Sequence, residues 1–201
     1  MSNSAVLVID IQNDFCPGGA LGVSEGDQIV PGINAVMREA AAVVLTQDWH
    51  PDGHQSFASQ HADHAPMDTI SMDYGEQVLW PDHCIQGSYG AAFHDDLEVD
   101  RAEVIVRKGF RREVDSYSAF FENDQTTPTG LAGYLQNRGI DDLLICGLAT
   151  DFCVAWSALD ATKLGFSTTV RLDLCRAIDL DGSLAAAIRQ MQQAGVALSS
   201  G

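Results

Sequence analysis

Short apolar runs alternate with helix-like segments along this chain. Mainly apolar runs predict six strands, at residues 5–9, 42–45, 103–107, 143–146, 167–172 and 196–198. Helices are predicted between them at residues 31–41, 131–137, about 150–164 and 184–194, with glycines 139, 165 and 195 suited to helix ends. Strands that alternate with helices imply parallel pairing through right-handed crossovers. The pattern therefore predicts an α/β fold: a three-layer α/β/α sandwich around a mostly parallel six-stranded sheet.

The segment from about Pro51 to about Leu97 breaks this alternation. It is irregular and rich in His, Asp and Gly, and it contains Trp80, Cys84, Tyr89 and Phe93. Uncovered loops of this length are usually either functional or disordered. Because it carries aromatic residues and a cysteine, we expect a folded, functional loop.

Polar or reactive residues follow four of the predicted strands. Asp10, Asp48, Lys108 and the loop that leads to Cys153 each come directly after an apolar run. A single charge after a strand is usually a solvated turn residue. In an open parallel sheet, however, these strand ends share one edge, where ligands bind. The sequence thus predicts that the four positions meet in one crevice.

Cys153 is the candidate nucleophile. Thr150 is expected to cap a helix, with Asp151 in its first turn, which places Cys153 at the positive end of the helix dipole. Such a position can lower a thiol pKa from ~8.5 toward ~3.5–7.5. The free backbone N–H groups of the same turn could bind an oxyanion. The alternative is a small core residue, since free cysteines are commonly buried.

Composition narrows the classes of function. The 201 residues suit a single domain, spanning residues 1–201, and the 28 acidic against 11 basic residues give a formal charge of −17. This charge disfavours nucleic acid and anionic membranes as partners. Five cysteines without a CxxC motif favour a reducing, cytoplasmic location without a disulfide framework. No signal peptide is expected, and no apolar run approaches the ~18 residues that span a membrane.

Several motifs together resemble the isochorismatase-like superfamily of cysteine hydrolases and, within it, the nicotinamidases. The resemblance covers nearly the whole chain. Its motifs are residues 8–15 (VIDIQNDF), 48–51 (DWHP), 80–84 (WPDHC), 86–87 (QG), 108–109 (KG), 117–120 (YSAF) and 147–154 (GLATDFCV). The DWHP and WPDHC motifs are the more specific part. In the resembled proteins they form a metal site, which superfamily members with other substrates generally lack.

The resemblance implies a catalytic set and an activity. Cys153 would attack an amide carbonyl, and Asp10 would transfer protons. Lys108 would favour the ionised carboxylate of Asp10 and the thiolate of Cys153. Backbone amides of Ala149 and Cys153 would form the oxyanion hole, beside a cis Leu148–Ala149 peptide bond. The implied reaction converts nicotinamide, or pyrazinamide, to the acid and ammonia in NAD salvage. A simpler interpretation is that Asp10 and Lys108 form a structural salt bridge, which is compatible with their catalytic roles.

The resemblance also implies a metal site and a substrate pocket. Asp48, His50 and His83 would bind a divalent metal, with zinc favoured and iron(II) or manganese as alternatives. His54, four residues beyond His50, is a candidate for a further ligand or a supporting partner, although such a spacing is unremarkable in a loop. His61, His64 and His94 match no motif and are expected to be solvated. Phe15, Trp80 and Tyr117 would line the pocket, although core packing explains Tyr117 equally well. Phe152 stands where some relatives carry a polar residue, so it would alter pocket polarity.

Two alternatives stay open at this point. One is another amidase of the superfamily that acts on a carbamoyl or ureido compound. The other is a non-enzymatic metal- or thiol-containing binding protein with the same fold, which the intact Asp10, Lys108 and Cys153 argue against. The expected partner is a small-molecule substrate, and assembly into a homo-oligomer is left open.

Overall fold

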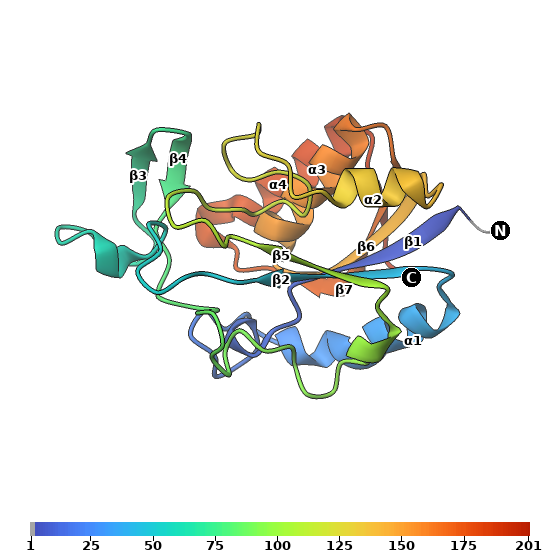
Figure 1. Ribbon diagram of the computed structural model, residues 1–201, viewed down its shortest axis with the longest axis horizontal. Coiled ribbons are helices and arrows are strands. Elements are labelled where there is room, and N and C mark those ends of the chain that lie inside the picture. The colour runs from blue at the N-terminus through green and yellow to red at the C-terminus, as the bar shows by residue number, and fades with distance from the viewer. Residues whose placement is uncertain (1–2) are drawn as a thin grey trace.

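The computed structural model describes residues 3–201 and is built on a six-stranded sheet (Figure 1). The strands lie in the order β5-β2-β1-β6-β7-β8, and every pair is parallel. Their bounds are β1 Ser4–Ile9, β2 Val43–Asp48, β5 Val104–Lys108, β6 Asp142–Leu148, β7 Ser167–Arg176 and β8 Ala197–Ser199. The predicted α/β sandwich with a six-stranded sheet is confirmed, and the sheet is wholly parallel.

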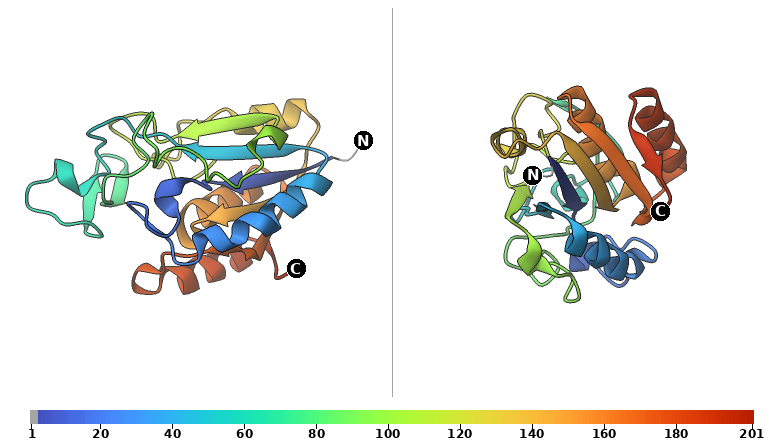
Figure 2. Two further views of the ribbon diagram at one scale, coloured as in Figure 1. Left: turned by 90° about the horizontal axis from the view of Figure 1, so that it is seen from below. Right: turned by 90° about the vertical axis from the view of Figure 1, so that its right-hand side faces the viewer.

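Within residues 3–201, four α-helices form the outer layers. They are α1 Val30–Glu39, α2 Leu131–Asn137, α3 Ala155–Lys163 and α4 Ser183–Gln193. Helix α1 lies on one face of the sheet, and α2, α3 and α4 lie on the other (Figures 1 and 2). Right-handed crossovers explain this division. The connection through α1 runs from β1 to β2, toward the β5 edge of the sheet, whereas the connections through α2, α3 and α4 run toward the β8 edge. Across residues 3–201, no helix has the length and apolar character needed to cross a membrane.

The long segment between β2 and β5 is folded, as expected. It contains an antiparallel hairpin, β3 Thr69–Met72 and β4 Gly75–Val78, which the sequence analysis did not predict. The hairpin projects beyond the carboxyl edge of the main sheet, at the left of Figure 1. Bridges from Phe57 to Trp80 and from His50 to Ile85 tie the segment to itself near β2. The segment thereby brings Trp80 and His83 to the edge where Asp48 and Lys108 end their strands.

The predicted helix after β6 differs from the expectation at its start. Residues Thr150–Val154 form a π-helical turn, and α3 begins only at Ala155. The residue before the turn is Ala149, and no side chain caps it, so the prediction that Thr150 is an N-cap was wrong. Thr150 instead has a buried side chain inside the turn. The wider π turn changes which side chains face the sheet edge, and single-turn π segments are frequent at functional sites.

Candidate active site

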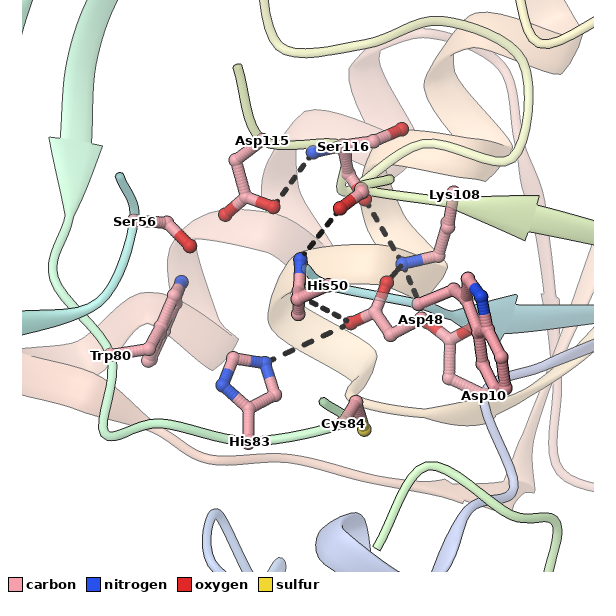
Figure 3. Close-up of polar contacts among 12 residues, drawn as sticks. Asp10, Asp48, His50, Ser56, Trp80, His83, Cys84, Lys108, Asp115 and Ser116 are labelled. Atoms are coloured by element: carbon pink, nitrogen blue, oxygen red, sulfur yellow. Dashed lines mark hydrogen bonds and ion pairs between the residues drawn. The ribbon is translucent and has the colours of Figure 1, made fainter. Parts of the chain in front are cut away.

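Asp10, Lys108 and Cys153 meet at the carboxyl edge of the sheet, as predicted. The Nζ atom of Lys108 lies 2.8 Å from Oδ2 of Asp10 and 3.4 Å from Sγ of Cys153. It also donates to the carbonyl oxygen of Ser116 at 3.0 Å and forms an ion pair with Asp48. All of these groups are buried. One buried ammonium therefore connects the nucleophile candidate, the acid–base candidate and the candidate metal ligand Asp48. Figure 3 shows Lys108 beside Asp10 and Asp48.

The conformation of Asp10 is fixed by its neighbour on β2. The hydroxyl of Thr46 donates to Oδ1 of Asp10 at 2.6 Å and accepts the backbone N–H of Asp10 at 3.2 Å. Asp10 has a positive φ of 48°, a left-handed backbone that is uncommon outside glycine. With Oδ1 held by Thr46, Oδ2 is the oxygen that faces Lys108. No local pattern points to Thr46, because its role depends on the pairing of β1 with β2.

Electrostatics separate the roles of the two reactive groups. Burial raises the pKa of Asp10 to about 6, although Lys108 acts to lower it. Burial also raises the pKa of the Cys153 thiol well above its usual range, against the lowering effect of Lys108. The expected depression of the Cys153 pKa by the helix start is therefore wrong for this structure. Burial of Cys153, which is 7% exposed, together with the nearby carboxylates of Asp10 and Asp48, outweighs the lowering effect of the Lys108 ammonium on the thiol pKa.

The turn that carries Cys153 is anchored by close backbone contacts. The Leu148–Ala149 peptide bond is cis, as the resemblance implied. A Cβ atom on Gly147 would lie 2.1 Å from the carbonyl oxygen of Ile9, so only glycine lets β6 approach β1 here. The carboxylate of Asp151 accepts the backbone N–H groups of Ile178 and Asp179 at 3.1 and 2.7 Å. Asp151 therefore binds the segment after β7 to this turn, in addition to placing a negative charge in the first turn of the helix.

Asp48, His50 and His83 converge as predicted for a metal site. Oδ2 of Asp48 lies 3.7 Å from Nε2 of His50 and 3.9 Å from Nε2 of His83. With metal–ligand bonds of about 2.1 Å, two tetrahedral donors lie roughly 3.4 Å apart. Figure 3 shows Asp48 between Lys108 on one side and the two imidazoles on the other. The three donors are close to the spacing that one divalent ion requires.

The second nitrogen of each imidazole is fixed by a backbone carbonyl. Nδ1 of His50 bonds Gly109 at 2.9 Å, and Nδ1 of His83 bonds Pro81 at 2.8 Å. These bonds put the N–H on Nδ1 and leave Nε2 as an electron-pair donor, the arrangement typical of metal-bound histidines. Among the residues that the structure describes, Nε2 of His50 is buried and has no hydrogen-bond partner. An orphaned buried nitrogen beside a carboxylate fits a metal ligand, so the donor set suits a divalent cation.

Two of the three candidate donors, His83 and Asp48, have pKa values that keep them in the form that binds metal. Burial and the neighbouring His50 lower the pKa of His83 to about 4, which keeps its imidazole neutral near pH 7. Burial raises the pKa of Asp48, but Lys108 and the two imidazoles outweigh it and hold that pKa below its usual range. A neutral imidazole and an ionised carboxylate are the forms that bind metal. For His50, burial lowers the pKa, but the neighbouring Asp48 outweighs burial and raises it.

His54 is placed beside this set rather than in it. Its Nδ1 bonds the hydroxyl of Ser56 at 2.7 Å, and its Nε2 bonds the carbonyl of Arg111 at 2.8 Å. Its ring packs on His50 with centroids 4.5 Å apart. Both nitrogens are engaged, so of the two roles left open by the sequence, the geometry fits the supporting partner. His61, His64 and His94 are at least partly exposed.

The predicted aromatic residues line one small pocket. Trp80 contacts Phe152 edge-on with ring centroids 4.8 Å apart, and Tyr117 contacts Phe152 at 5.6 Å. The hydroxyl of Tyr117 accepts from Nε1 of Trp80 at 3.1 Å, which leaves its ring for the pocket wall. Phe15, Cys153, Ala149, Asp48 and His83 line the same pocket. The nucleophile candidate and two of the metal-ligand candidates therefore face one aromatic cavity.

Known proteins match this fold and site. The family model described as the isochorismatase domain matches residues 4–201. The nicotinamidase of Acinetobacter baylyi is 53% identical over 97% of this chain and 91% of its own. A solved nicotinamidase and pyrazinamidase of Acinetobacter baumanii is 56% identical, with a TM-score of 0.98 over 99% of this chain and 96% of its own. A pyrazinamidase of Pyrococcus horikoshii, solved in complex with zinc, is 35% identical, with a TM-score of 0.80 over 98% of each chain.

The chain belongs to the isochorismatase family. This membership confirms the resemblance that its motifs predicted, including the resemblance to nicotinamidases within that family. It is an enzyme of the hydrolase type represented by these relatives.

Proposed function

We propose that this chain hydrolyses nicotinamide to nicotinate and ammonia, and that it also accepts pyrazinamide. The observation that carries the proposal is the shared pocket, in which Cys153 faces the same aromatic cavity as Asp48 and His83. A planar pyridine ring suits aromatic walls, which stack favourably on it. The names of the relatives at 53% and 56% identity support the same substrate class. We also propose that the chain acts as one domain.

In the first half of the reaction, Asp10 removes the proton of the Cys153 thiol. Its pKa of about 6 leaves the carboxylate mainly ionised at neutral pH yet basic enough to accept a proton. As Sγ bonds the amide carbon, the N–H groups of Ala149 and Cys153 hold the developing oxyanion. Asp10 then passes its proton to the amide nitrogen, the C–N bond breaks, and ammonia leaves a thioester on Cys153.

The second half returns the enzyme to its starting state. Asp10 accepts a proton from water as the water oxygen bonds the thioester carbon. The C–S bond breaks, the acid is released, and the proton returns to Sγ. Lys108, 2.8 Å from Asp10 and 3.4 Å from Cys153, stabilises whichever of the two groups is negative. A high resting pKa of the thiol fits this scheme, because thiolate forms only as Asp10 takes the proton.

Asp48, His50 and His83 would hold a divalent metal, with zinc favoured. A bound metal would supply a Lewis acid for the pyridine nitrogen and so orient the ring. The protein's own part is to fix the donors: Gly109 and Pro81 orient the imidazoles, and Lys108 shares the Asp48 carboxylate. The zinc in the Pyrococcus relative supports this assignment.

An ammonia-release assay with nicotinamide, with and without chelator, tests the proposal. We expect turnover that falls when chelator removes the metal and returns on addition of Zn²⁺. Benzamide keeps the amide but lacks the ring nitrogen, so His50→Ala should affect benzamide turnover less than nicotinamide turnover. Absence of ammonia release from metal-loaded protein would contradict the proposed substrate. Full nicotinamide turnover in excess chelator would contradict the metal's role.

A further inference from the structure

Asp115 is a buried carboxylate in the pocket wall that the proposed mechanism does not use. Its side chain is 2% exposed, and it lines the same pocket as Asp48 and His83. It lies between β5 and α2, in the segment that follows Lys108. Figure 3 shows its carboxylate pointing toward the space bordered by Ser56, Trp80 and His50.

Neutral groups are the hydrogen-bond partners of this carboxylate. Oδ2 accepts from the amide of Gln77 at 3.0 Å, and Oδ1 accepts the backbone N–H of Ser116 at 2.8 Å. In the part of the chain that the structure describes, no lysine or arginine forms an ion pair with Asp115. A buried charge without an opposite charge is costly. A cation near Asp115 would remove that cost.

The charges around the pocket point to the same conclusion. Asp10, Asp48 and Asp115 are buried carboxylates, and Lys108 is the buried ammonium that pairs with the first two. Among these four side chains, three negative charges face one positive charge, which is an excess of two. A divalent cation would balance that excess.

Asp115 stands at the edge of the metal-ligand set. One of its oxygens lies within 4.8 Å of ring nitrogens of both His50 and His54, but no ion pair within 4.0 Å joins them. Asp115 does not belong to the group formed by Asp48, His50 and His83. Such a separation is too long for a hydrogen bond and suits a bridging water.

We propose that Asp115 is a positioning residue of the metal site, whose carboxylate accepts hydrogen bonds from water on the bound divalent cation. Its negative charge favours the cation, and its two bonds to Gln77 and Ser116 keep it aimed at the site. This inference rests on the metal site proposed above and adds a second carboxylate to it. Partners of this kind typically change metal affinity by about 10–100-fold.

Zinc affinity of the purified protein, measured by competition with a chromophoric chelator, tests the proposal without reference to activity. Asp115→Asn keeps the size of the side chain and removes its charge, and we expect zinc binding weaker by about 10–100-fold. Asp160→Asn is the matched control, because Asp160 is a 5% exposed carboxylate on α3, outside the pocket lining. We expect it to bind zinc as the wild type does. If Asp115→Asn folds poorly, Asp115→Ser must show the same loss.

Thermal unfolding of the zinc-free proteins separates this role from ordinary packing. Removal of an uncompensated buried charge should leave the zinc-free Asp115→Asn variant at least as stable as zinc-free wild type. The rise in Tm on zinc addition should be smaller in the variant. Wild-type zinc affinity in Asp115→Asn, with binding lost in His50→Ala, would overturn the role of Asp115 alone. A wild type that binds no zinc would overturn the metal site and this inference together.

Discussion

The side-chain amide of Gln12 is both a hydrogen-bond donor and an acceptor to the backbone of Asp48. Its Oε1 accepts the N–H of Asp48 at 2.8 Å, and its Nε2 donates to the carbonyl of Asp48 at 2.9 Å. These bonds continue the pairing of β1 with β2 past the end of β1, where the left-handed backbone of Asp10 interrupts the strand. A side chain near the acid–base candidate thereby fixes the position of a metal-ligand candidate.

Gln12→Met should destabilise the fold and weaken metal binding. The buried N–H and carbonyl of Asp48 would lose their partners, which costs about 1–3 kcal/mol for each unsatisfied group. Gln47→Met is the matched control. Gln12 and Gln47 both donate to the carbonyl of Ala91, but the side chain of Gln47 does not bond the backbone of Asp48. Denaturant unfolding and zinc competition measure the two effects. Equal zinc affinity in both variants would show that Gln12 does not position the ligand.

Gly109→Ala should displace His50 and lower metal affinity. A Cβ atom at Gly109 would lie 2.4 Å from Cε1 of His50, at a φ of 64°. Gly139→Ala is the control, because Gly139 has a similar φ of 68° but no atom within 4 Å of the added Cβ. Both variants should lose stability through backbone strain, since alanine fits positive φ poorly. Only Gly109→Ala should lose zinc, and retention of zinc there would contradict the fixed position of His50.

Asp10→Asn should lower kcat by at least about a hundredfold, because general acid–base catalysis typically contributes ~10²–10⁴-fold. The amide keeps the shape of the side chain and can still meet Thr46, but it cannot accept a proton. Substrate binding should change much less, so the loss should appear in kcat rather than KM. Steady-state ammonia release measures both constants. A loss below tenfold would mean that another group accepts the thiol proton.

The pH profile of kcat/KM should show an acidic limb near pH 6. The pKa of Asp10 is raised to about 6 by burial, and the protonated carboxyl below that pH cannot act as a base. Turnover should therefore fall as pH decreases through 6 and level off above it. Metal content measured at each pH separates this limb from loss of metal. A profile that stays flat down to pH 5, with metal retained, would contradict the role of Asp10.

The sequence predicted the sheet well because its strands are continuous apolar runs bounded by polar residues. Residues 5–9 and 143–146 lie inside β1 and β6, and Asp48 and Lys108 end neighbouring strands in register. It missed the hairpin at Thr69–Val78, whose strands are largely exposed and lack an apolar pattern. It also placed the end of β7 too early, because Asp173 and Arg176 interrupt the apolar run.

Only those site residues could be predicted from the sequence whose own side chains are reactive or bind metal. Asp10, Asp48, Lys108 and Cys153 stood out by their positions after predicted strands, whereas His50 and His83 were identified through their match to the motifs of the family. Thr46, Gln12 and Asp115 did not stand out, because their roles come from strand pairing and from loop packing that local sequence does not encode. The pKa of Cys153 was misjudged for the same reason: desolvation depends on how much of the chain covers the thiol.

Mass analysis of Cys153 during turnover tests the central claim most directly. Enzyme mixed with excess nicotinamide and quenched in acid should carry one nicotinoyl group, located on the peptide that contains Cys153. Cys153→Ala should remain folded, carry no such group and release no ammonia, while Cys146→Ala, changed at a buried cysteine of β6, should carry the group as wild type does. Ammonia release by Cys153→Ala at the wild-type rate would contradict the thioester account.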